Sequence, residues 1–245
     1  MYSQVTESQF IADLAAALGD PVLVNELLRQ DPECIRMRVS DEHFPMVSPR
    51  NGGTIYQWKL GWYVSACQVA RSFGHQKIFD LLMESSPAEE KLLNACWLHD
   101  EVMVTSLLRQ NPQLAQSLPP AGRRHVAHGA RNHDLSAVRL MLRAGLPVNV
   151  SSQHHATALH WAAFHGDAEM ARMFLDHRAD LENADNEFEG TPLNWAIYGS
   201  QNAWHPEKGD HAATVKVLLA AGARPPKELG GIGEVREVLR QHGVR

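Results

Sequence analysis

The chain has 245 residues, of which 44% are hydrophobic and 21% charged, with a formal net charge of −5. This apolar share can bury a sizeable core, and no Lys/Arg cluster is longer than Arg123-Arg124, which disfavours a nucleic-acid binder. No run approaches the ~18 apolar residues of a membrane span, residues 1–10 lack the pattern of a signal peptide, and three cysteines fit no disulfide framework. We therefore expect a cytoplasmic protein.

Helical patterns alternate with turn residues along the chain. After a first helix predicted at residues 7–18, turn residues recur at Gly19, Gly74, His99, His133 and Gly166. Glycine adopts a left-handed backbone at little cost, and histidine is among the other residues enriched there. We therefore interpret His99 and His133 as turn residues and not as ligands. A final amphipathic helix is predicted near residues 232–242.

Two insertions interrupt this alternation. In the first, residues 41–61, the period of two that starts at Tyr56 favours a short β-arm near residues 54–64. The alternative is a flap that buries Trp58 and Trp62. The second insertion, residues 200–209, contains Trp204-His205-Pro206 and is predicted to be a loop between two helices.

Self-comparison shows a repeat. The segment Thr157-Ala158-Leu159-His160-Trp161-Ala162-Ala163 returns 34 positions later as Thr191-Pro192-Leu193-Asn194-Trp195-Ala196-Ile197. Nearer the N-terminus, residues 27–32 return as residues 107–112. These segments resemble the ankyrin repeat, whose signature opens T-P-L-H-x-A and whose period is ~33 residues. Within that family the chain looks similar to bacterial members, although residues 124–127 and the first three units depart from the signature.

The resemblance implies an all-α ankyrin-repeat solenoid of about six helix-turn-helix units in a single domain, residues 1–245. The units are expected near residues 8–40, 62–86, 88–120, 121–152, 153–186 and 187–226, with a C-terminal capping helix at 232–242. In the best unit, Thr157 is expected to cap the first helix and Gly166 to end it. Met170, Met173 and Phe174 then form an apolar stripe at helical spacing.

The resemblance also implies a protein-protein interaction module without catalysis of its own, which binds its partner through the concave face, the fingers between repeats and the Trp204 loop. In ankyrin proteins the residues before the inter-helix turn face the concave groove, and Tyr, Trp and Arg are favoured at protein interfaces. The predicted partner-binding residues are therefore Phe73, Trp97, Arg131, Asn132, Phe164, His165, Tyr198, Trp204 and His205. A Trp204 side chain folded back onto the repeats is the alternative for the loop. We expect a monomer that binds another protein, without nucleic acid, membrane or cofactor.

Fourteen histidines raise the alternative of a small metal- or ligand-binding or enzymatic protein that uses the His-rich units 4 and 5. His125 with His128, and His154 with His155, His160 and His165, are the candidate ligands. No H-E-x-x-H motif, Cys/His framework, G-x-S-x-G or Walker motif accompanies them. The family resemblance instead implies that His160 bonds backbone groups of the adjacent turn. We therefore predict neither a metal site nor an enzyme.

Overall fold

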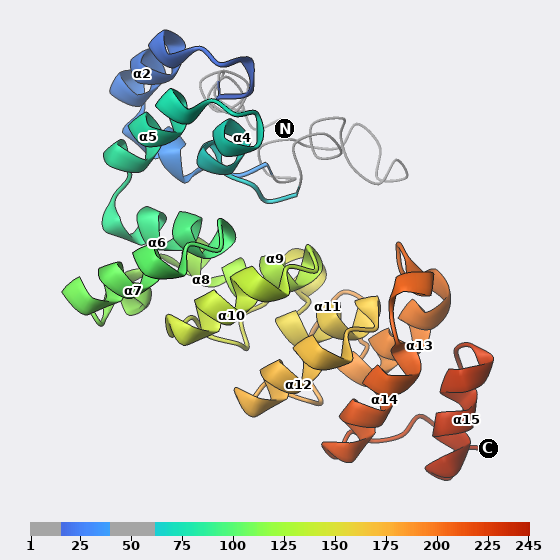
Figure 1. The fold of residues 1–245 in the computed structure, drawn as a ribbon. Coiled ribbons are helices and arrows are strands. Elements are labelled where there is room, and N and C mark those ends of the chain that lie inside the picture. The colour runs from blue at the N-terminus through green and yellow to red at the C-terminus, as the bar shows by residue number, and fades with distance from the viewer. Residues whose placement is uncertain (1–15, 40–61) are drawn as a thin grey trace. The chain divides into compact units, whose positions relative to one another are not determined.

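The computed structural model describes residues 16–39 and 62–245 (Figure 1). Within these ranges the chain is helical, and the only β pairings are two isolated bridges, Arg38 with Ser65 and Ser151 with Thr157. The predicted all-α class is therefore confirmed. The chain consists of two compact units, Met1–Leu114 and Ala115–Arg245. No helix in the described ranges is long and apolar enough to cross a membrane.

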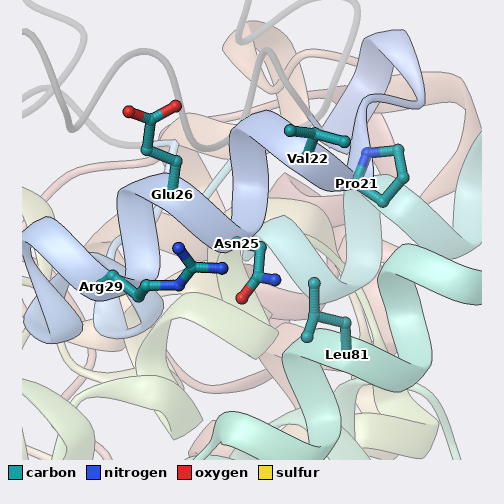
Figure 2. A pocket seen from close by; sticks show the side chains of 6 residues that line it. All are labelled: Pro21, Val22, Asn25, Glu26, Arg29 and Leu81. Atoms are coloured by element: carbon teal, nitrogen blue, oxygen red, sulfur yellow. The ribbon is translucent and has the colours of Figure 1, made fainter.

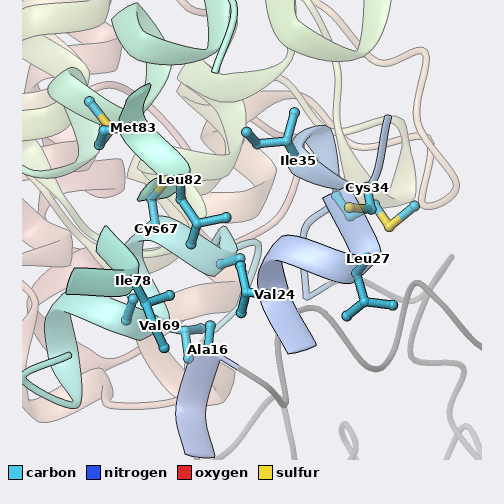
Figure 3. Close-up of a cluster of buried hydrophobic side chains, with 13 residues drawn as sticks. Ala16, Val24, Leu27, Cys34, Ile35, Cys67, Val69, Ile78, Leu82 and Met83 are labelled. Atoms are coloured by element: carbon cyan, nitrogen blue, oxygen red, sulfur yellow. The ribbon is translucent and has the colours of Figure 1, made fainter. Parts of the chain in front are cut away.

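The unit Met1–Leu114 is built from short helices joined by tight turns. Its helices are α2 (Pro21–Gln30), α4 (Ala66–Ser72), α5 (Gln76–Ser85), α6 (Ala88–Trp97) and α7 (Glu101–Gln110), with the 3-10 turn η1 (Pro32–Arg36) after α2. Asp20 caps α2, and Ser65 forms a capping box with Gln68 at the start of α4. α4 packs against α5, and α6 against α7. The apolar faces of α2, α4 and α5 meet in one core that includes Val24, Leu27, Cys67, Ile78 and Leu82 (Figure 3).

A buried polar cluster lies beside this core. Arg38 and Glu90 form an ion pair of 2.6 Å, and both side chains are about 5% exposed or less. Asn94 accepts from both Arg38 and Ser65 through its side-chain oxygen. A buried charge is costly without a partner. The cluster therefore fastens two segments to α6, which carries Glu90 and Asn94: the segment around Arg38 and the start of α4 at Ser65.

Most of the predicted β-arm, residues 54–61, and Trp58 lie outside the described residues. The end of the arm is described, and there the backbone N–H of Val39 donates to Val64 while that of Tyr63 donates to Val39. Trp62 is half-buried.

The unit Ala115–Arg245 consists of helix pairs stacked in sequence order (Figure 1). The first helices of the pairs are α9 (His125–Arg131), α11 (Ala158–His165) and α13 (Pro192–Asn202). The second helices are α10 (Leu135–Arg143), α12 (Ala168–Asp176) and α14 (His211–Ala220), with α8 (Pro120–Arg123) before the stack. α11 packs against both α9 and α13, and α14 packs against α12 and α15 (Gly233–Gln241). Three 3-10 turns, η3 (Leu114–Ser117), η4 (Gln153–His155) and η5 (Pro206–Lys208), complete the described elements.

The local predictions for the best unit are confirmed. Thr157 is the N-cap of α11 in a capping box with His160, and Gly166 ends the helix at φ 71°. Met170 and Phe174 are buried on α12, with Met173 half-buried. His99 and His133 are in the left-handed region, with φ of 58° and 56°, as their interpretation as turn residues requires.

The C-terminal capping helix is also present as α15, with Val235, Val238 and Leu239 buried and Arg236 and Arg240 exposed. One boundary differs from the prediction. Residues 200–202, assigned to the inserted loop, extend α13 by most of a turn. Ser200 supports this extension because its hydroxyl donates to Ile197 and accepts from the N–H of Ile232. The division into six units within one domain stays a prediction.

Candidate functional site

An aromatic pocket of about 520 Å³ lies in the unit Ala115–Arg245. α11, α13, the loop before α13 and the inserted segment all contribute to it. We call it the aromatic pocket; its lining residues are His154, Trp161, Phe164, Phe188, Gly190, Asn194, Trp195, Tyr198, Asn202 and Trp204.

The repeat itself places the first two tryptophans. Trp161 and Trp195 occupy equivalent positions of successive units, and because α11 packs on α13 their rings meet edge to face at 5.4 Å. The Trp161 indole N–H donates to the Ser152 hydroxyl over 3.1 Å. Gly199 allows this close packing, because a Cβ there would overlap the backbone of Phe164. The back wall of the pocket is therefore fixed by two neighbouring repeats.

A tight turn before α13 presents Phe188. The Asn186 side chain is buried, accepts from the N–H of Phe188 and donates to the Gly190 carbonyl over 2.7 Å. The His160 Nε2 atom lies 3.0 Å from the same Gly190 oxygen and 3.1 Å from that of Asn183, so this nitrogen carries the proton. Burial lowers the pKa of His160 to about 4, which keeps the ring neutral. The structural role that the resemblance implied for His160 is confirmed.

The inserted segment adds Trp204 to the lining of the pocket. Its ring lies 5.9 Å from Trp161, 5.7 Å from Phe164 and 5.3 Å from His165, yet the residue stays 51% exposed. The alternative interpretation of a tryptophan folded back onto the repeats is therefore correct. Half of its surface still faces solvent beside the pocket.

Arg131 and His165 both contact the Trp204 ring. The Arg131 guanidinium lies 4.8 Å from the Trp204 ring centroid and 5.4 Å from that of Trp161, and it donates to the Gln153 side chain over 3.0 Å. The His165 Nε2–H donates to the Arg131 carbonyl over 2.8 Å. Burial lowers the pKa of His165 to about 4. These contacts give the exposed tryptophan a fixed position.

The predicted partner-binding residues divide into three groups. Phe164, Tyr198 and Trp204 line the aromatic pocket, while Arg131 and His165 support it. Asn132 caps α9 and His205 is exposed near Glu207, and neither lines the pocket. Phe73 belongs to the other unit, where it is half-exposed and stacks on His75.

Trp97 requires a correction. It was predicted to face a partner, but it is only 6% exposed at the end of α6, whose C-terminal half is buried. The repeat pattern predicted the turn that follows Trp97, but it did not predict which side of α6 its indole ring occupies.

Sequence reasoning missed several lining residues, namely His154, Trp161, Phe188, Asn194, Trp195 and Asn202. The tryptophans were used only as markers of the repeat. The available signal was the pair of tryptophans at one repeat position, which stacked units must bring together. Phe188 had a weaker signal, an aromatic residue between two glutamates in a turn.

Two other features do not form comparable sites. A second pocket of about 500 Å³ lies on α2 in the unit Met1–Leu114, with lining residues from Pro21 to Arg29 together with Leu81, and it contains no aromatic ring (Figure 2). The rings of His125 and His128 are 6.4 Å apart, but no group of three His, Cys, Asp or Glu side chains in residues 16–39 and 62–245 is arranged to hold a metal ion.

Comparisons with known proteins address the family. Residues 125–228 match the family model described as ankyrin repeats (3 copies). The chain is 28% identical over 126 residues to the palmitoyltransferase Hip14 of Drosophila melanogaster. The aligned region covers 51% of this chain and 18% of that protein. It is 26% identical over 91 residues to the putative palmitoyltransferase ZDHHC13 of Danio rerio, and this aligned region covers 37% of this chain and 13% of that protein. The chain thus spans less than a fifth of the length of either relative.

Among solved structures, the crystal structure of the human ASB11 ankyrin repeat domain superposes with a TM-score of 0.54 at 16% identity, covering 96% of this chain and 98% of that one. The two palmitoyltransferases are animal proteins, so they do not support the expected likeness to bacterial members. The matched repeats and the shared fold agree with the stacked helix pairs that surround the aromatic pocket. Residues 125–228 of this chain are ankyrin repeats, and the chain has the ankyrin-repeat fold.

Proposed function

We propose that the chain is a protein-interaction module whose aromatic pocket holds a segment of a partner protein. The observation that carries this proposal is the grouping of Phe188, Tyr198 and Trp204 around one pocket, with exposed fractions of 62%, 60% and 51%. Exposed aromatic side chains that cluster on one surface are typical of protein-binding sites and are a liability without a partner.

The polar groups at the pocket favour binding over catalysis. The Asn194 side chain accepts from the backbone N–H of Thr191 in a capping box, and Asn202 donates to the Tyr198 carbonyl. The Nδ1 atom of His154 lies 2.7 Å from Glu187. The proposal therefore includes no catalytic activity, and the enzyme activity in the relatives' names is not carried over to a chain that matches so little of their length.

The rival hypothesis of a metal or small-ligand site in the His-rich repeats is less favoured. His160 and His165 each use Nε2 to donate to backbone carbonyls, and burial keeps both rings neutral. A ligand would have to replace those bonds. We further propose a cytoplasmic monomer that binds neither nucleic acid nor membrane. The buried positions of Cys34, Cys67 and Cys96 are compatible with a cytoplasmic location.

The test is affinity capture from extracts of the native cell with the full chain as bait. Trp204→Ala and Tyr198→Ala remove exposed rings from the pocket, and Val102→Ala removes an exposed apolar side chain from the other unit. Partners that wild type and Val102→Ala retain should be lost from both pocket variants. Undiminished capture by the pocket variants would remove the proposed site. Phe164→Ala is a poorer probe because Phe164 is only 9% exposed and its loss would disturb the packing of α11.

A further inference from the structure

We propose that the aromatic pocket receives an arginine side chain from a basic segment of the partner protein. This inference rests on the proposed function and specifies the chemistry of the occupant. Three features support it. The pocket's rings already bind the Arg131 guanidinium, the neighbouring loop is acidic, and the turn that carries this loop has a fixed backbone.

The rings of this cluster already accept a guanidinium. Arg131 lies over Trp204 and Trp161, at 4.8 and 5.4 Å from the ring centroids. A cation over an aromatic face is attracted by the negative potential of the ring. In the same pocket the Phe188 ring lies 5.6 Å from the Trp195 ring and 5.4 Å from the His154 ring, and no lysine or arginine from the described ranges stacks on Phe188. Trp195 is only 8% exposed, so the rings here that a further cation can reach are those of Phe188, at 62%, and Tyr198, at 60%.

The loop that carries Phe188 is strongly acidic. Residues 179–190 contain five carboxylates and no lysine or arginine. Glu182 pairs with Arg224, and Glu187 with His154, but Asp185 and Glu189 are exposed and form no ion pair with any residue that the structure describes. Glu187 and Glu189 therefore flank Phe188 in the sequence, with Asp185 three residues before it, and this chain compensates their negative charge only in part.

The backbone of the turn that carries these residues is held by hydrogen bonds. Glu189 has a left-handed backbone at φ 50°, and its N–H donates to the Asn186 carbonyl over 3.0 Å. The buried Asn186 side chain fixes the same turn from inside. The backbone of this acidic turn is thus fixed next to Phe188, which lines the pocket.

Arginine matches both features better than the other side chains. Its planar guanidinium stacks on aromatic rings and still directs N–H donors outward to carboxylates. An apolar side chain would occupy the rings but would desolvate the nearby carboxylates without compensation, and an acidic segment would be repelled. A basic segment with one arginine in the pocket, against the exposed rings of Phe188 and Tyr198, is therefore the occupant we infer.

Peptide titration of the full chain tests this inference. The probes are the blocked peptide Gly-Ser-Arg-Ser-Gly and matched peptides with citrulline, lysine or leucine in place of arginine. Binding is measured by the NMR chemical shifts of the tryptophan indole N–H groups. Citrulline is the main control because it keeps the shape and loses the charge. The arginine peptide should shift these resonances saturably and bind more tightly than the other three, and added salt should weaken it.

Matched variants locate the charge. Glu187→Gln together with Glu189→Gln should weaken the arginine peptide about threefold to tenfold, the size expected for two exposed carboxylates. Glu228→Gln, an exposed carboxylate outside residues 179–190, should leave binding unchanged. Equal binding of the arginine and citrulline peptides, no saturable shift, or an unaffected double variant would overturn the inference. The proposed function would survive that result if Trp204→Ala and Tyr198→Ala still abolished capture of the native partner.

Discussion

The imidazole of His211 occupies the space that a side chain at Gly166 would need. Its Nε2–H donates to the Phe164 carbonyl over 3.0 Å, and a Cβ built on Gly166 would meet the ring at 2.8 Å. The other unit repeats this relationship, with His75 bonded to the Ala17 carbonyl beside Gly19. Glycine at these turns therefore supplies both a left-handed backbone and room for the next repeat's histidine.

The first prediction separates these two roles of glycine. Gly166→Ala should destabilise the unit Ala115–Arg245 by more than Gly222→Ala, since a Cβ at Gly222 meets nothing within 4 Å. Both positions have positive φ, so Gly222→Ala measures the backbone strain alone, about 1–2 kcal/mol. Urea denaturation gives both values. In the His211→Ala background the two substitutions should cost about the same, and a persistent difference would contradict the steric explanation.

The second prediction concerns acid. His160 and His165 have pKa values lowered to about 4 by burial, so the unfolded chain binds protons at them near pH 6.5 while the folded chain does not. Stability is therefore present above about pH 6.5 and is lost as the pH falls toward 4, with a slope approaching ~1.4 kcal/mol per pH unit for each histidine. Urea midpoints at several pH values measure it. His165→Gln, which can still donate to the Arg131 carbonyl, should flatten the slope, and an unchanged slope would refute the assignment.

The third prediction concerns the His133–Asp167 pair, whose stabilising effect is lost as the pH rises and not as it falls toward 4. The side-chain hydrogen bond to Asp167, at 3.1 Å, raises the pKa of His133. For Asp167, burial opposes ionisation, but the bonds from His133 and the N–H of Met170 together lower its pKa. The pair therefore stabilises the fold below about pH 6.5, loses that effect as the pH rises through the raised pKa of His133, and fails again below the lowered pKa of Asp167. His133→Gln should cost most between roughly pH 4 and 6.5 and least at pH 9; a constant cost across this range would argue against the pair.

The fourth prediction tests the support of Trp204. Arg131→Met keeps the length of the side chain and removes the cation over Trp204 and Trp161. Backbone amides of residues 203–209 should then exchange hydrogen about twofold to fivefold faster, as expected for losing an exposed cation–π contact. Arg172→Met, an exposed arginine on α12, serves as the control. Unchanged exchange in the inserted segment would mean that His165 and the aromatic contacts hold Trp204 by themselves.

The fifth prediction compares a buried and an exposed ion pair in the same unit. Glu90→Gln leaves the Arg38 charge buried without its carboxylate and should cost about 3–5 kcal/mol. Glu33→Gln removes a carboxylate that is 75% exposed beside Arg36 and should cost ~1 kcal/mol or less. Denaturation of the full chain measures both free energies. Similar small costs would show that water reaches Arg38.

Residues that act over one helical turn could be predicted from the sequence. The Thr157 cap, the Gly166 helix end and the left-handed backbone of His99 and His133 all depend on neighbours within a few positions. The same holds for α15, whose apolar stripe contains Val235, Val238 and Leu239. Trp161 and Trp195 are separated by one repeat in the sequence, and this separation predicted that the two repeats stack on each other.

The tertiary structure decided which aromatic side chains remain accessible. Trp97 and Tyr198 were predicted at the same position of their repeats, but one is 6% and the other 60% exposed. Trp204 lies against Trp161 and Arg131, far from it in sequence, and Phe188 lines the same pocket because Asn186 and His160 fix its loop. Burial depends on what the neighbouring elements place over a residue, which local periodicity does not encode. The sequence by itself therefore determined the repeat, and the packing of successive repeats determined the pocket.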